Sequence, residues 1–541
     1  MFSGSRLAFA PHARGAREGQ PRGISAQFPA QQTQTTDVAL GNRVGGLVSI
    51  LRAARRTARG IGALALSVGT PNAFATQELG TMFWTTGLRL PACSDSIEIR
   101  GLFTEHHYLP DTHAKKAALD GATGFVAAID GALAAPLSSE RRNKVRILAR
   151  EILEANDAAT CEKGLSALAH EVKSLGLQPR GDGDGKPLLL RLLQEYAKAW
   201  DPHSAILAGS DLANFETDLY AQAQRGTMSM RTIFLDGSPT KVATIRIPVF
   251  YGASKGVAGK EGPSSSDDVR TMLRTAERFG AKAVVLDLRD NPGGPILEGM
   301  STVGRTIGGG AVVGLRPREG YATIYGDGSD VVSYRGTLVV LVNDRTTSSA
   351  EIVAGALDDY RRALIFGDGA TFGKGTSQTP IPLKDFDVVP MITTATFHTP
   401  SGRSPQRIGV TPGVRAVCGS TNKPRVSERD LPRAIAAEPL PAFRASLDRV
   451  NPPVRRAGDQ ASSDPVERTW RPVTQQVLDG ITAELERRKA ERNELCAQGI
   501  EVPSGDVVGR EAAWIAALLA KVQEERPIDR DGESTSHTSA R

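Results

Sequence analysis

Short apolar runs alternate with amphipathic stretches through the middle of the chain. The runs at 283–288, 336–342 and 363–367 are almost entirely apolar, which is typical of short strands buried on both faces of a sheet. Between and around them, apolar residues at helical spacing predict helices over 267–279 and 348–360. Strands that alternate with helices in this way predict an α/β core whose sheet is buried on both faces.

The segments on either side of this core have helical patterns. From 109 to about 223 the chain is rich in Ala, Leu, Lys, Glu and Arg, and beyond about Thr421 it is polar, punctuated by Pro, and helical over 477–492 and 511–525. We expect the charged tail after Arg526 to be disordered. The predicted organisation is a leader (1–75), a mainly helical domain (76–227), an α/β domain (228–420) and a C-terminal helical region (421–541).

The net charge of +6 by itself suggests a nucleic-acid partner, but the positive charge is concentrated in one segment of the chain. Residues 1–75 carry nine Arg against two acidic residues, a local charge of +7, so the remaining chain carries −1. A body without excess positive charge does not predict binding to phosphate, and we expect no nucleic-acid partner. No run of about 18 apolar residues occurs, so we also expect no membrane span in the mature chain.

The leader has the layout of a secretory signal peptide. A basic cluster at 52–59 is followed by a short apolar region at 60–69 and by the small-x-small site Ala73-Phe74-Ala75. We therefore expect export with cleavage after Ala75, and a translation start near Val44 or Val48. Two alternatives stay open: an Arg-rich disordered leader before a short buried helix, and an organellar transit peptide.

Four cysteines occur, at positions 93, 161, 418 and 496. No Cys-x-x-Cys pair exists and no Cys lies near a plausible His pair, so neither a zinc site nor a thioredoxin-type centre is indicated. Export would permit disulfides, but we expect free buried thiols for at least one pair.

Three stretches of the α/β core carry residue types suited to catalysis. Asp287–Gly294 is a strand that runs into a Gly-Gly turn, Asn343–Ile352 places hydroxyl residues between a strand and a helix N-terminus, and Phe372–Thr376 sets one Lys between glycines. Each has an ordinary explanation as a turn, a helix cap or a solvated Lys. A phosphate-binding loop is excluded, because Lys374 is followed by Gly375 instead of Ser or Thr.

Together and in this order, the three stretches resemble the catalytic core of peptidase family S41, the C-terminal-processing or tail-specific serine proteases. The segments 196–204, ending in Asp-Pro-His-Ser, and 407–412 also resemble family segments. The helical flanks resemble those of the larger periplasmic members. The resemblance implies a ClpP/crotonase-like ββα core flanked by helical regions, and a periplasmic endopeptidase that needs no cofactor and acts on exported, unfolded or tail-exposed polypeptides. Membrane association, an activating adaptor and a homo-oligomer are left open.

The resemblance implies that the nucleophile is the hydroxyl residue three positions before the Glu of the following helix. That Glu is Glu351, so the nucleophile is Ser348. Ser349 stands where the family usually has Ala. The general base is Lys374, and Gln378 matches the residue that orients the Lys amine. An ordinary Lys is protonated at neutral pH, so this chemistry requires a buried Lys with a lowered pKa.

The resemblance places the oxyanion hole at the backbone N–H of Ser349 and that of Gly293 or Gly294. A His-based triad is the rival within the same class, with His203 or His398 as its base. The Asp-Pro-His sequence that ends at His203 is better explained as a structural turn. We expect the adjacent pair 106–107, both His, to be solvated.

One departure of the chain from the family bears on its function. Processing peptidases of this type carry a PDZ domain of about 80–90 residues before the catalytic strands, but here only 39 positions separate His203 from Val242. This puts a preference for C-terminal tails in doubt. A non-catalytic peptide- or protein-binding adaptor on the same fold is the alternative function, and a crotonase-like acyl-CoA enzyme is a more distant one.

Overall fold

The structure is a computed structural model, and all the residues it describes belong to one of the two units into which the chain divides, Met1–Leu7 with Ala75–Arg541. The described residues are 5–7, 90–133, 135–177, 186–208, 212, 225–252, 263–327, 332–383, 387–418, 426–443, 470, 472–500 and 506–525. The signal-peptide-like segment with its cleavage site after Ala75 and the tail after Arg526 lie outside them.

The described N-terminal part is helical, as predicted, but the first helix that the structure describes there begins at Cys93 instead of near 109. Its elements are α3 (Cys93–His106), η3 (Asp111–His113), α4 (Ala114–Ala132), α5 (Ser139–Glu154), α6 (Ala158–Ser174) and α7 (Lys186–Trp200). Helices α5 and α6 start where Ser138 and Asp157 accept N–H bonds from their first turns. The helices share one apolar core, in which Phe103, Phe125 and Trp200 are almost completely buried.

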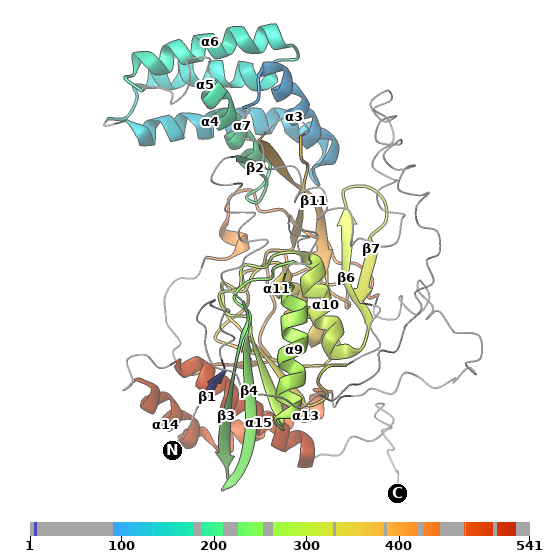
Figure 1. Ribbon diagram of the computed structural model, residues 1–541. Helices are drawn as coiled ribbons and strands as arrows, with labels where there is room; N and C mark the ends of the chain where they lie inside the picture. Colours follow the sequence, from blue (N-terminus) through green and yellow to red (C-terminus); the bar gives the residue numbers. More distant parts are fainter. Residues whose placement is uncertain are drawn as a thin grey trace, which may run out of the picture. The chain divides into compact units, whose positions relative to one another are not determined.

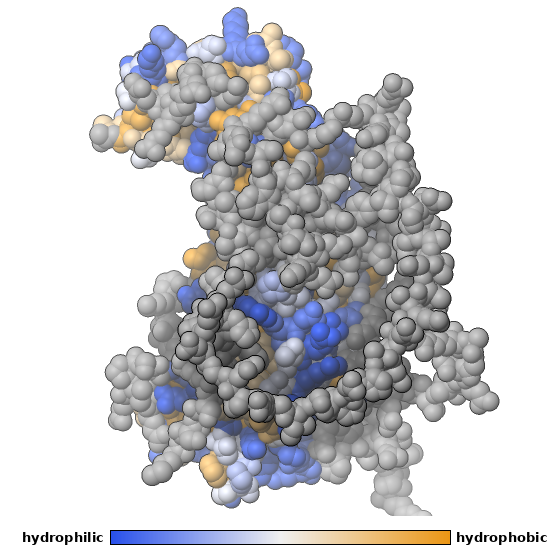
Figure 2. All heavy atoms as spheres, in the orientation of Figure 1, coloured by the Kyte–Doolittle hydropathy of each residue, from blue (hydrophilic) through white to orange (hydrophobic). Residues whose placement is uncertain are grey.

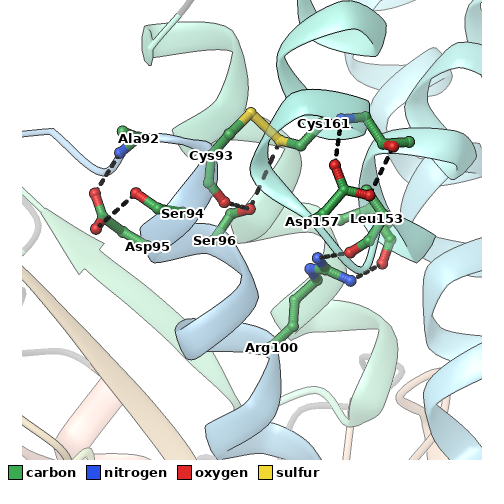
Figure 3. Close-up of a disulfide and its surroundings, with 11 residues drawn as sticks. Ala92, Cys93, Ser94, Asp95, Ser96, Arg100, Leu153, Asp157 and Cys161 are labelled. Atoms are coloured by element: carbon green, nitrogen blue, oxygen red, sulfur yellow. Dashed lines mark hydrogen bonds between the residues drawn. A yellow bond between two sulfur atoms is a disulfide. The ribbon is translucent and has the colours of Figure 1, made fainter.

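Both pairs of cysteines form disulfides, so the expectation of free thiols is wrong for each of them. Cys93–Cys161 ties α3 to α6, and nearby Arg100 donates to two backbone carbonyls at the end of α5 (Figure 3). Cys418–Cys496 ties the segment after the last strand to helix α14 (Lys489–Ile500). The partners are 68 and 78 positions apart, so no local pattern could reveal that their Cα atoms lie 5.6 and 4.9 Å apart.

The predicted α/β core is confirmed. Seven strands form one sheet in the order β1-β3-β4-β5-β8-β9-β12, parallel from β4 onward. Their bounds are β1 (Ser5–Leu7), β3 (Thr227–Leu235), β4 (Ser238–Arg246), β5 (Ala283–Asp287), β8 (Thr337–Val342), β9 (Leu364–Gly367) and β12 (Val414–Arg415). Strands β5, β8 and β9 lie where the apolar runs predict them, since both of their faces are buried.

Helices cover both faces of this sheet (Figure 1). Val284 and Leu286 of β5 share a core with α9 (Ser265–Arg278), α10 (Ile296–Ile307) and α11 (Ser349–Asp359). Val285 points to the opposite face, where α13 (Gln475–Arg487) and α15 (Val507–Glu525) pack. The helix predicted over 477–492 is two helices, α13 and α14, which meet at Arg488. Hydrophilic residues gather over α9 on the face shown in Figure 2. Arg274 and Arg278 of this helix are exposed, and Arg270 is partly exposed.

A second, antiparallel sheet was not predicted. Its order is β10-β11-β6-β7, with β2 also paired to β11, and its strands are β2 (Ala205–Ala208), β6 (Gly310–Pro317), β7 (Thr323–Asp327), β10 (Thr376–Pro380) and β11 (Val388–His398). In the described stretch 426–443, where we predicted helix, the only regular element is the short η4 (Glu428–Asp430).

The connection between β2 and β3 runs only from 209 to 226, which is too short for a domain of the PDZ size. Among the described residues, no helix combines the length and the apolar character that crossing a bilayer would require.

Candidate active site

Ser348 lies at the junction between strand β8 and helix α11. Its φ of 58° is unusual for a residue with a side chain, and its N–H donates to the Glu351 carboxylate at 2.9 Å. The residue is half-buried. The junction therefore places a hydroxyl side chain at the start of a helix, in a backbone conformation typical of functional sites.

The neighbouring Ser349 has a different role. It is completely buried, and its hydroxyl donates to the carbonyl oxygen of Gly294 at 2.6 Å. This hydroxyl holds the Gly-Gly turn against α11, so the geometry favours Ser348 over Ser349 as the nucleophile.

Lys374 lies in the loop between β9 and β10. Its Nζ donates to the carbonyl oxygen of Thr376 at 3.0 Å and to Oε1 of Gln378 at 2.6 Å. Burial lowers the pKa of Lys374 to about 8, although the carboxylates of Glu428, Asp201 and Glu351 act in the opposite direction. A neutral amine has two N–H groups and one lone pair, so the two acceptors occupy both N–H groups and leave the lone pair free to take a proton.

Glu351 joins the two predicted catalytic residues. Its Oε2 accepts the N–H groups of both Ser348 (2.9 Å) and Lys374 (2.8 Å), while its Oε1 accepts from Gly373 N–H and the Thr371 hydroxyl. The side chain is completely buried, and this burial raises its pKa to about 7 against the effect of its four donors. One carboxylate therefore holds the backbones of Ser348 and Lys374 side by side.

The Gly-Gly turn after β5 lies against the start of α11. A Cβ atom on Gly293 would lie 2.7 Å from Ser348 Cβ and 3.1 Å from the nitrogen of Ser349, so this approach requires glycine. The N–H of Gly293 donates to the side chain of Asn291 at 2.8 Å. The N–H of Gly294 has no such acceptor within the described part of the chain. Of the two predicted alternatives, Gly294 is therefore the one available, beside Ser349, to bind an oxyanion.

The predicted solvation of the pair 106–107 is wrong for His107. Its side chain is completely buried, and Nδ1 accepts the N–H of Leu109, so Nε2 carries the proton and donates to Asp201 at 2.7 Å. Asp201 is 94 positions away along the chain, so no local pattern could point to the contact.

The two histidines proposed for a rival triad have partners other than Ser348. His203 Nε2 contacts the Glu428 carboxylate at 2.6 Å, and His398 Nε2 bonds to the carbonyl oxygen of Glu438 at 2.8 Å. The turn that ends at His203 is structural, as predicted, because the Asp201 side chain accepts its N–H at 2.9 Å. The described contacts give a His-based triad no support.

Sequence reasoning missed two residues of the site. Thr393 accepts a hydrogen bond from Nε2 of Gln378 at 3.0 Å, and Glu428 acts electrostatically on Lys374. Thr393 belongs to the unpredicted strand β11, and Glu428 lies in a polar segment. No spacing pattern pointed to either residue.

One group of side chains has the composition of a metal site. Among the described residues it consists of Cys418, Cys496 and Glu511. The two sulfur atoms are joined in a disulfide, and Glu511 already accepts bonds from Arg492 and from the backbone at Cys418. This group is better explained as a structural cross-link than as a metal centre.

Several known proteins are similar to part of this chain. Residues 241–416 match the model of Peptidase family S41. The chain is 38% identical over 150 residues to "Carboxyl-terminal-processing peptidase 2, chloroplastic" of Arabidopsis thaliana. It is 42% identical over 149 residues to "Carboxy-terminal-processing protease" of Bartonella bacilliformis, and 34% identical over 180 residues to "Tail-specific protease" of Haemophilus influenzae. These matches cover 28%, 27% and 32% of this chain.

The matched region is only part of each protein. The chain spans 29%, 33% and 24% of the lengths of these three curated relatives. Among solved structures, "Photosystem II D1 C-terminal processing protease" is 30% identical with a TM-score of 0.29, covering 33% of this chain and 43% of that one. The region that matches the model of Peptidase family S41, residues 241–416, contains Ser348, Lys374 and Gln378.

Proposed function

We propose that the chain is a serine endopeptidase that works through a Ser348–Lys374 dyad. The observation that carries the proposal is the environment of Lys374: its pKa lies near 8, both of its N–H groups have acceptors, and Glu351 holds its backbone beside that of Ser348. A Lys prepared in this way can act as a general base near neutral pH. The names of the matched relatives, which are processing and tail-specific proteases, support the same activity.

The proposed reaction has two steps, acylation of Ser348 and hydrolysis of the acyl-enzyme. Neutral Lys374 takes the proton of the Ser348 hydroxyl while the Ser348 oxygen bonds to the carbonyl carbon of a substrate peptide bond. The N–H groups of Ser349 and Gly294 stabilise the resulting oxyanion, and each such donor contributes roughly 3–4 kcal/mol in sites of this kind. Protonated Lys374 then donates its proton to the leaving amine, and water hydrolyses the acyl-enzyme in a second, equivalent step.

The proposed substrates are exported polypeptides that are unfolded or expose a tail, and the proposed location is the periplasm. The basic, apolar and small-residue order of the leader supports export. Because the connection 209–226 cannot hold a PDZ domain, we expect cleavage to depend only weakly on the identity of the substrate C-terminus. An amidated and a free apolar tail on one unfolded reporter should be cleaved at rates within a few-fold of each other.

Casein digestion by the wild type and by two matched single variants tests the dyad. Ser348→Ala should abolish cleavage, while Ser349→Ala, which removes only the bond to Gly294, should keep substantial activity. If Ser349→Ala is the inactive variant, the nucleophile is wrongly assigned. If the purified wild type binds casein without cleaving it, the peptidase proposal fails and the binding-adaptor function is favoured.

A further inference from the structure

The turn that follows α7 contains Asp201, whose side chain is buried inside the protein. Asp201 is completely buried, and its Oδ1 accepts the N–H groups of His203 (2.9 Å) and Ser204 (3.2 Å). Its Oδ2 accepts from His107 at 2.7 Å. Burial by itself would raise the pKa of Asp201, but these donors hold it near 2, so the side chain is a carboxylate.

A directional chain of hydrogen bonds leads from this carboxylate to Lys374. The Thr393 hydroxyl lies 3.0 Å from Asp201 Oδ1, Gln378 Nε2 lies 3.0 Å from Thr393 Oγ1, and Lys374 Nζ lies 2.6 Å from Gln378 Oε1. A carboxylate only accepts, so Thr393 must donate to Asp201. Its oxygen then accepts from the NH₂ of Gln378, which also donates to the Thr376 hydroxyl at 3.0 Å, and the Gln378 oxygen is left facing Lys374. The Thr376 hydroxyl could donate or accept, so it is the Thr393 hydroxyl, committed to Asp201, that sets the direction of the amide.

The same turn reaches the backbone next to Lys374 by a second route. His203 contacts the buried Glu428 at 2.6 Å, Glu428 accepts from Nε2 of Gln406 at 2.9 Å, and Gln406 accepts the N–H of Gly375 at 2.6 Å. Both the side chain of Lys374 and the backbone beside it are therefore connected to one turn.

We propose that Asp201 and Thr393 are positioning residues for the base: they fix the amide of Gln378 so that its oxygen, and not its NH₂, faces Lys374. The inference rests on the proposed peptidase function and extends it to residues outside the dyad. If the amide turned over, its NH₂ would donate to the lone pair of neutral Lys374. The amine could then no longer take the proton of Ser348.

The test uses Thr393, because a Thr→Val change keeps the shape of the side chain and removes the hydroxyl. We expect Thr393→Val in the full chain to lower kcat at least tenfold with KM within about twofold. Thr393→Ser, which restores the hydroxyl, should keep kcat within about threefold of the wild type. Thr396→Val is the matched control: Thr396 lies on the same strand, is equally buried, and its hydroxyl has no hydrogen-bond partner among the described residues. It should leave kcat unchanged.

A second readout separates positioning from damage to the fold. The pH dependence of Lys374 acylation by acetic anhydride, followed by peptide mass spectrometry, reports its pKa without any substrate turnover. Loss of the oriented Gln378 oxygen disfavours the ammonium, so Thr393→Val should lower the pKa of Lys374 below that of the wild type. A pKa that rises toward 10.5 would mean that water had entered a damaged site, and it would overturn the proposal, as would a wild-type kcat. Failure of the wild type to cleave casein would refute the peptidase function, while the labelling experiment would still decide the positioning role.

Discussion

Replacing Lys374 by Met should make the protein inactive but relatively more stable at neutral pH. A Lys whose pKa falls from 10.5 in the unfolded chain to about 8 in the folded one carries an energetic cost whenever it is protonated in the fold. Met has a similar length and no charge, so it removes that cost. It also removes the amine's bonds to Thr376 and Gln378, each worth about 1 kcal/mol.

The pH dependence of this effect can be worked out from the two pKa values. At pH 7 the shift costs the wild type about 3 kcal/mol, because Lys374 is protonated in both the folded and the unfolded state. As pH rises through 8 the folded protein loses the proton first, and at pH 10 the remaining cost is below about 1 kcal/mol. The difference in unfolding free energy between Lys374→Met and the wild type should therefore change by about 2–3 kcal/mol between pH 7 and pH 10, with the variant favoured at pH 7.

Urea denaturation followed by tryptophan fluorescence measures this difference in the full, disulfide-bonded chain. Groups that do not interact with Lys374 titrate alike in both proteins and cancel, and the lost hydrogen bonds are the same at the two pH values. Glu351 does interact with Lys374, and its pKa of about 7 places its titration at the lower end of this range. Ser348→Ala serves as the control and should show no such pH-dependent difference from the wild type. A difference that is constant within about 0.5 kcal/mol would show that the pKa of Lys374 is not lowered, and the argument for a neutral base would fail.

Three further outcomes are expected. The wild-type kcat/KM for an unfolded substrate should rise about tenfold from pH 7 to pH 9 as Lys374 loses its proton, whereas a base with an unshifted pKa would give a rise near a hundredfold. Gly294→Ala should abolish cleavage, because its Cβ would lie 2.0 Å from a backbone oxygen; Gly280→Ala, also at positive φ but with nothing within 4 Å, should remain active. Replacing both Cys93 and Cys161 by Ser should lower the unfolding free energy in urea by about 4 kcal/mol, since the bond closes a 68-residue loop, and an unchanged midpoint would contradict this.

The central sheet could be predicted because burial on both faces leaves a local signature. Strands β5, β8 and β9 have no solvent-facing positions, so their sequences are nearly pure apolar runs. Strand β10, with the sequence Thr-Ser-Gln-Thr-Pro, has no such run, and it forms because β11 supplies its partners. Its existence depends on pairing across the hairpin, which pattern analysis does not capture.

In the candidate site, too, some residues lie in local sequence motifs and others come together only in the fold. Ser348, Lys374 and Gln378 lie in short motifs whose order along the chain is recognisable. The contact between Asp201 and Thr393 joins positions 192 apart, so their relation becomes visible only in the folded chain. Short motifs could therefore point to Ser348, Lys374 and Gln378 as candidates, whereas Asp201 and Thr393, which are linked only in the folded chain, could not be found in this way.

Helix α15 has a consequence for how the protein is made. Residues 507–525 cover the face of the sheet to which Val285, Val339 and Leu341 point, and most of the helix is itself buried. The strands that carry those side chains are synthesised well over a hundred residues before helix α15, which packs on them. During synthesis or transport, an apolar sheet face would therefore stay open until nearly the whole chain is available. We expect chains that stop before 507 to aggregate or to need chaperones. We also expect the Ser348–Lys374 site to keep its geometry only in the finished molecule, so incomplete chains should cleave little.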